Sequence, residues 1–220
     1  MRHFLKELGE LQQKLLEMGG LVESSIRESV LTLVEHRAQH AAVVWSNEAR
    51  INRLEIEIDE LAVRLLALQQ PIAGDLRFIT AAIKINTDLE RMGDLAVNIA
   101  QRAVLLIENP VQKAFVEIPR MAMLSQQMVG KALDAFVRRD PDLAREVLLS
   151  DDEVDTLRSC IYHELIEFMK KDSTAIAEGV DLILISRHLE RIADHATNIA
   201  EDTLFLVKGV DVRHHAETNA

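Results

Sequence analysis

Two short polar motifs, one hundred residues apart, are the part of this chain most able to do chemistry. The string ERMGDLAVNIA begins at Glu90 and ERIADHATNIA begins at Glu190, and seven of their eleven positions are identical. Each contains Glu, then Asp four residues later, then Asn four residues after that. Positions i, i+4 and i+8 lie nearly above one another on an α-helix. Each motif therefore predicts one polar stripe of two carboxylates and an amide: Glu90, Asp94 and Asn98 in the first copy, and Glu190, Asp194 and Asn198 in the second.

Two further polar pairs with the same spacing precede the two chain reversals, near residues 72 and 173. Each pair lies about as far before its reversal as the matching motif lies after it. Antiparallel helices with arms of equal length bring such residues to the same height, with axes roughly 8–10 Å apart. We therefore expect two polar clusters, Glu48, Asn52, Glu90 and Asp94 in the first, and Asp151, Asp155, Glu190 and Asp194 in the second.

Clustered carboxylates repel one another, and a bound cation reverses that repulsion. Mg²⁺, Ca²⁺ and Mn²⁺ take oxygen ligands of this kind, so the duplicated clusters predict divalent metal binding. The competing interpretation is neutralisation by arginines, since Arg91 can reach Asp94 and Arg187 can reach Glu190 at i, i+3. His188 and His195 flank the second motif and are further candidate ligands.

Long amphipathic helices must carry these clusters. Apolar residues recur at every third or fourth position, and strand-like alternation is missing from the sequence. Proline and polar residues break the pattern at 70–75, 109–119, 140–141 and 171–173. A weaker break is expected at Ser46-Asn47. The expected fold is all-α, with six long helices in two tandem three-helix bundles: 1–109 as the first repeat, 110–207 as the second, and 208–220 as a frayed tail.

Composition excludes several classes of protein. The net charge of −11 and the 4% aromatic content argue against a nucleic-acid-binding surface. One cysteine, Cys160, cannot form an internal disulfide, and we expect it to be buried in the core. We expect neither a signal peptide nor a transmembrane segment, so the cytoplasm is the predicted compartment.

Enzyme motifs are also missing from the sequence. A ferritin-like di-iron site needs Glu-x-x-His on two helices, and no histidine here has a glutamate three residues before it. The nucleophile elbow Gly-x-Ser-x-Gly and the phosphate-binding loop do not occur. Two alternatives to a metal-binding adaptor stay open: a metal-dependent hydrolase or oxidase that uses the clusters as catalytic centres, and a purely structural bundle without metal.

At the level of whole motifs, the chain resembles the PhoU family of phosphate-transport regulators. The similarity covers nearly the whole chain, and the paired Glu-Arg-x-Gly-Asp and Glu-Arg-x-Ala-Asp signatures at this separation are specific. The stretches that carry it are LLALQQPIAGDLR at 65–77, DLERMGDLAVNIA at 88–100, DDEVDTL at 151–157 and HLERIADHATNIAED at 188–202.

The resemblance implies a cytoplasmic, non-enzymatic regulator. It implies divalent metal bound by the two clusters named above, as iron or zinc in some members and magnesium or manganese in others. The implied partners are the ATPase subunit of the phosphate ABC transporter and a sensor histidine kinase, with repression of phosphate-starvation genes as the outcome. We also expect a homodimer, because wide apolar stripes leave a face to cover. Asn52 stands where the family has an aspartate, so we expect the second repeat to hold metal more tightly.

Overall fold

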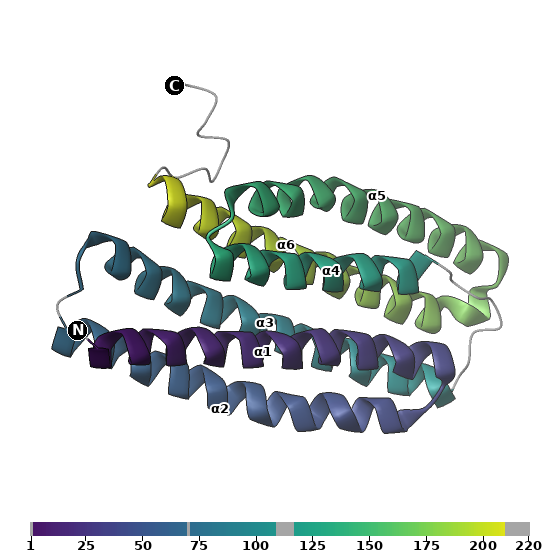
Figure 1. Cartoon of the computed structure of the whole chain (residues 1–220). Coiled ribbons are helices and arrows are strands. Elements are labelled where there is room, and N and C mark those ends of the chain that lie inside the picture. Colours follow the sequence, from purple (N-terminus) through teal and green to yellow (C-terminus); the bar gives the residue numbers. More distant parts are fainter. Residues whose placement is uncertain (1, 70, 109–116, 210–220) are drawn as a thin grey trace.

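Six long α-helices dominate the computed structural model, which describes residues 2–69, 71–108 and 117–209. They pack as two three-helix bundles, one formed by α1–α3 and the other by α4–α6 (Figure 1). This confirms the all-α fold of two tandem three-helix bundles. In chain order the elements are α1 (Arg2–Glu35), α2 (Ala38–Gln69), α3 (Ala73–Glu108), α4 (Glu117–Arg138), α5 (Pro141–Lys171), the 3-10 helix η1 (Ser173–Ala175) and α6 (Ile176–Lys208).

The helix boundaries follow the sequence pattern except at three places. The break expected at Ser46-Asn47 is wrong: α2 runs through it, because Val44, Ile51 and Leu54 continue one buried stripe across the site. Pro119 lies inside the first turn of α4, where a missing N–H costs nothing. The last helix ends at Lys208, one residue later than expected, and Gly209 closes it with φ 70°. Residues 109–116 of the linker expected at 109–119, and residues 210–220 of the tail expected at 208–220, lie outside the described residues.

The turns between the helices are fixed by local side-chain chemistry. Asp140 caps α5, because its side chain accepts hydrogen bonds from the backbone N–H groups of Asp142 and Leu143. Asp172 ends α5 and caps η1 through the N–H of Thr174. These caps set where each hairpin reverses, and so they set which residues of α5 and α6 lie at the same height.

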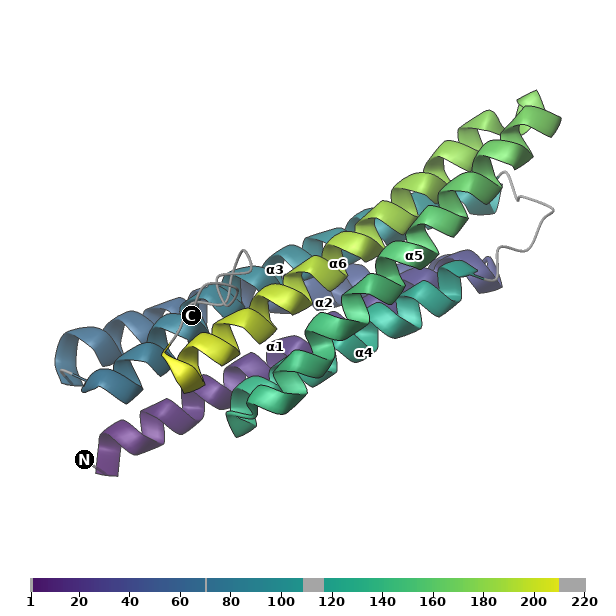
Figure 2. The same ribbon diagram turned by 90° about the horizontal axis from the view of Figure 1, so that it is seen from above.

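A single apolar core runs through both bundles. Within each bundle all three helices touch, and between bundles α3 packs on α6 and α1 packs on α4 (Figure 2). The α1–α4 contact is close at Gly19, where a Cβ atom would lie 2.1 Å from Cδ1 of Leu133. Gly93, in the first polar motif, similarly lets α2 approach α3, with Ile51 as the contact. No described helix is apolar for long enough to span a membrane.

Cys160 is exposed, and the expectation that it fills the core is wrong. The buried stripe of α5 advances from Leu157 to Ile161, a step of four. Cys160 therefore falls just outside the stripe, on the solvent side of the helix.

Candidate metal centre

The second predicted cluster is brought together by the α5–α6 hairpin. Burial first, and then the negative charges of Asp155, Asp194, Asp152 and Glu190, raise the pKa of Asp151 to about 6. Burial also raises the pKa of Glu190 and of Asp194, and Asp155 on the facing helix adds to both shifts. All four predicted carboxylates of this repeat therefore lie within electrostatic range of one another, as the hairpin counting predicted.

One arginine forms an ion pair with a carboxylate of this cluster, and it is neither of the two arginines that the sequence suggested. Arg158 on α5 places Nε 3.2 Å from Oε2 of Glu190. Neither Arg91 nor Arg187 forms an ion pair within the described part of the chain, although Arg187 lowers the pKa of Glu190 from a greater distance. Three of the four carboxylates, Asp151, Asp155 and Asp194, are thus left without an ion-pair partner among the described residues.

The first cluster lies between α2 and α3, where Glu55, which was not predicted, joins Glu90 and Asp94. Burial raises the pKa of Glu90, followed by the charges of Asp94 and of Glu55 on α2. Glu55 was not predicted, although Glu55 and Asp59 have the same four-residue spacing. It lies one turn beyond Asn52 and so on a neighbouring part of the same face. Glu48 is half-buried and Asn52 is exposed, and within the described residues neither makes a hydrogen bond or ion pair.

The two repeats differ in charge at one equivalent position. Glu55 lies seven residues after Glu48, and Arg158 lies seven residues after Asp151. In the first repeat this position adds a negative charge beside Glu90, and in the second it pairs a positive charge with Glu190. The carboxylate that Asn52 removes from the first cluster is therefore replaced by Glu55.

These oxygens suit a hard divalent cation by type, but they do not form a finished ligand shell. Within residues 2–69, 71–108 and 117–209, no group of three or more His, Cys, Asp or Glu side chains is arranged to hold a metal ion. Burial is the first cause of the raised pKa values of Asp151 and Asp194, and repulsion between neighbouring carboxylates is the second; a cation would relieve the repulsion. Binding would therefore require the side chains of Asp151, Asp155, Glu190 and Asp194 to rotate toward a common point.

Asp151 allows a direct test of what it costs to keep this cluster ionised in the folded protein. Its pKa is raised from 3.8 to about 6 in the folded protein, so the folded state binds the proton more tightly than the unfolded state does. Stability is therefore lost as pH rises from about 4 to about 6, and it stays low above that range. We expect Asp151→Asn to raise the free energy of unfolding by about 1–2 kcal/mol at pH 7.5 and to leave it unchanged below pH 4.

Urea unfolding of both proteins in EDTA at the two pH values measures this effect. Glu146→Gln, which removes an exposed charge from the same helix, serves as the control and should change stability by less than about 0.5 kcal/mol. Equal stability of Asp151→Asn and wild type at pH 7.5 would show that folding does not raise the pKa of Asp151.

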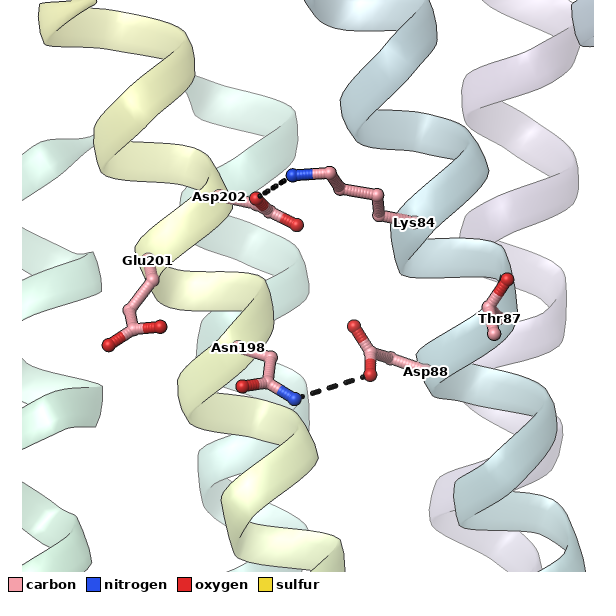
Figure 3. A pocket seen from close by; sticks show the side chains of 6 residues that line it. All are labelled: Lys84, Thr87, Asp88, Asn198, Glu201 and Asp202. Atoms are coloured by element: carbon pink, nitrogen blue, oxygen red, sulfur yellow. Dashed lines mark hydrogen bonds and ion pairs between the residues drawn. The ribbon is translucent and has the colours of Figure 1, made fainter. Parts of the chain in front are cut away.

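The two flanking histidines lie in the interface between the bundles. His195 is buried, and its Nδ1 lies 2.8 Å from Oδ1 of Asp88 on α3. Asn198, the third residue of the second motif, donates to the same carboxylate oxygen at 3.4 Å (Figure 3). Sequence reasoning missed Asp88 entirely, because its partners are more than one hundred residues away and no local spacing marks it. Asn198 therefore lies in the interface between the bundles, although the motif predicted that it would share one polar stripe with Glu190 and Asp194.

Comparison with known proteins identifies this architecture. The fold and the repeated clusters define a tandem three-helix-bundle protein with one acidic site per repeat. A PhoU domain model matches the chain twice, at residues 15–103 and 118–203, and the chain belongs to the PhoU family. The phosphate-specific transport system accessory protein PhoU homolog of Pseudomonas aeruginosa is 42% identical over 214 residues, which cover 97% of this chain and 88% of that protein. The homolog of the same name from Zymomonas mobilis is 39% identical over 95% of this chain and 88% of its own length.

Two crystal structures share the fold. PhoU from Pseudomonas aeruginosa superposes with a TM-score of 0.91 at 41% identity, over 94% of this chain and 100% of that one. The phosphate transport system regulatory protein PhoU from Streptococcus pneumoniae gives a TM-score of 0.88 at 33% identity, over 95% and 99% of the two chains. The similarity therefore extends through both bundles and includes their relative arrangement.

Proposed function

We propose that this protein is a non-catalytic regulator of phosphate uptake and phosphate-starvation signalling. The observation that carries the proposal is the match of both repeats to the PhoU family, together with relatives that are named as accessory proteins of a phosphate transport system. In this proposal the protein acts in the cytoplasm as an adaptor between the ATPase subunit of the transporter and a sensor histidine kinase. The homodimer expected from the sequence is part of the same proposal.

Direct binding to the purified partners and deletion of the gene test the adaptor role. The exposed Cys160 offers a single labelling site, so the labelled chain can be titrated with the purified ATPase subunit or kinase and followed by fluorescence anisotropy. We expect saturable binding to each partner, and deletion of the gene should release phosphate-starvation genes from repression in high phosphate. Failure to bind either partner, with normal repression in the deletion strain, would contradict the proposal.

Divalent metal binding by the acidic clusters is the second part of the proposal. The mutual electrostatic influence of Asp151, Asp155, Glu190 and Asp194 supports it, as does Glu90 with Asp94 in the first repeat. The residues proposed as ligands are the eight of the two predicted clusters, with Glu55 added to the first. The cation would be Mg²⁺, Mn²⁺, iron or Zn²⁺, all of which accept carboxylate oxygens.

Removing charge from one helix of the second cluster should remove its metal. We expect Asp151→Asn/Asp155→Asn to lower the affinity for Mn²⁺ at that site by at least about tenfold, because two carboxylate ligands are lost. Elemental analysis after purification and titration with Mn²⁺ measure the change. The control is Glu146→Gln/Glu167→Gln, which removes the same charge from exposed positions of α5. Equal metal content in wild type and both variants would exclude this cluster as the site.

A further inference from the structure

The outer face of α2 is apolar along much of its length. The helix packs on α1 and α3 through its opposite face, and it lies on the side of the first bundle away from α4–α6 (Figure 1). Trp45, Ile56 and Val63 are 43%, 59% and 60% exposed. Their spacing places them nearly above one another on the helix, with two exposed alanines on the same line. Together these residues form the α2 stripe: Trp45, Ala49, Ile56, Val63 and Ala67. Asn52 is a polar residue that interrupts it.

The corresponding face of α5, in the second repeat, is largely polar. Glu48 and Asp151 are equivalent in the two repeats, which sets the correspondence between α2 and α5. Three of the five positions of the α2 stripe then fall on exposed polar residues of α5: Asp152, Ser159 and Lys170. The other two fall on Leu148 and Ile166, which are partly buried. A three-helix bundle of this kind therefore folds without an apolar outer face, and an exposed stripe that folding does not need indicates a binding surface.

The α2 stripe is complementary in size to an antiparallel copy of itself. Ile56 lies midway between Ala49 and Val63, and also midway between Trp45 and Ala67. Around a two-fold axis at Ile56, Ala49 would face the partner's Val63, and Trp45 would face the partner's Ala67. Each large side chain then meets a small one, which allows two helices to pack closely.

The charges beside the α2 stripe are complementary in the same arrangement. Arg53 and Glu60 are exposed on one flank of the stripe, and neither forms an ion pair within the described part of the chain. They lie on opposite sides of Ile56 along the helix, so antiparallel pairing brings Arg53 of each copy to the partner's Glu60. Parallel pairing would instead place like charges opposite each other. Size and charge therefore fit a second copy of this chain in one orientation.

We propose that this protein dimerises by packing α2 antiparallel on α2 of a second copy, with Ile56 at the two-fold axis. The inference rests on the homodimer of the proposed function and names its interface. Trp45 and Ala67 lie about 33 Å apart along the helix, which gives the contact the length of a short antiparallel coiled coil. None of the five residues of the α2 stripe is a proposed metal ligand, so the interface does not require a bridging metal.

Sedimentation equilibrium in EDTA measures the dimer without any bridging metal. We expect wild type to be dimeric, and Ile56→Glu to raise the dissociation constant of the dimer at least about tenfold, because it buries two unpaired carboxylates at the axis. The matched control is Ser159→Glu, since Ser159 is the exposed equivalent of Ile56 on α5. The control should change the dissociation constant by less than about twofold. Circular dichroism of both variants should match that of wild type, because both positions are exposed.

Charge reversal tests the antiparallel orientation. Arg53→Glu and Glu60→Arg should each weaken the dimer by about threefold or more, because each places like charges opposite each other twice per dimer. The double variant Arg53→Glu/Glu60→Arg should recover the affinity of wild type, since opposite charges face each other again. A double variant weaker than either single variant would contradict the antiparallel pairing.

Two further results would overturn the inference, and they have different consequences for the proposed function. If Ile56→Glu were as dimeric as Ser159→Glu, the interface would lie elsewhere, and the homodimer of the proposed function would stand. A wild type that is monomeric throughout would remove the homodimer as well. If Ile56→Glu then also failed to bind the transporter ATPase subunit, the α2 stripe would be the docking surface of that partner instead.

Discussion

Replacing Phe136 by alanine should lower the free energy of unfolding by about 3–5 kcal/mol. Phe136 of α4 is fully buried, and its ring stacks on Phe78 of α3 with centroids 4.9 Å apart and an interplanar angle of 13°. The guanidinium of Arg139 lies over the Phe78 ring at 5.7 Å. The substitution would remove the aromatic contact and leave a cavity where the two bundles meet, and both effects destabilise the folded state.

Urea unfolding at one fixed protein concentration measures this loss, since oligomerisation would otherwise alter apparent stability. The midpoint should fall while the dependence on urea concentration stays the same, because the surface exposed on unfolding hardly changes. Tyr162→Ala is the control, since that ring is 45% exposed, and it should cost less than about 1 kcal/mol. If Phe136→Ala cost no more than Tyr162→Ala, the inter-bundle stack would not contribute to stability.

Helical geometry explains why the four carboxylates of the second cluster lie within electrostatic range of one another, whereas their role as metal ligands stays a prediction. A helix rises by about 1.5 Å per residue, so equal distances from a hairpin apex give equal heights, and caps such as Asp140 and Asp172 fix the apex. In the first repeat, equal height along the two helices did not identify every carboxylate near Glu90. The rotation of α2 about its own axis brings Glu55 into range of Glu90, and the sequence motif held no information about that rotation.

The arrangement of the two bundles could not be predicted from the sequence. Contacts between α3 and α6 join residues with long sequence separations, such as Asp88 with His195, and no hydrophobic period marks them. The ion pair of Arg158 was not predicted for the same reason, because its partner lies on the next helix instead of its own. Local periodicity determined the helices and their hairpins, whereas the packing of hairpin on hairpin depends on side chains whose partners are distant in the chain.

The buried polar pair between the bundles, Asp88 and His195, uses residues that the internal duplication did not preserve. The position equivalent to Asp88 in the second repeat is His188, and the position equivalent to His195 in the first is Leu95. Two identical repeats could therefore not form the pair. A buried polar contact of this kind favours one specific register, because any shift leaves its members without partners. We infer that the Asp88–His195 pair helps fix how the first repeat packs on the second.

Substitution of Asp88 by alanine should cost about 3 kcal/mol of stability, since it leaves the Nδ1 group of His195 buried without its partner. The cost should be much smaller once His195 is replaced as well, because the other partner of Asp88, Asn198, is exposed and can donate to water instead. A double-mutant cycle of Asp88→Ala and His195→Ala, measured by urea unfolding, should therefore give a coupling energy of about 1–3 kcal/mol.

The neighbouring ion pair provides the comparison for this cycle. Lys84 and Asp202 join the same two helices at 2.8 Å, but the Lys84 side chain is 46% exposed. Asp202→Ala should therefore cost less than about 1 kcal/mol, because water solvates the exposed Lys84 ammonium that remains. If the Asp88–His195 coupling were as small as the effect of Asp202→Ala, the buried pair would not hold the repeats in register, and apolar packing of α3 on α6 would have to do so alone.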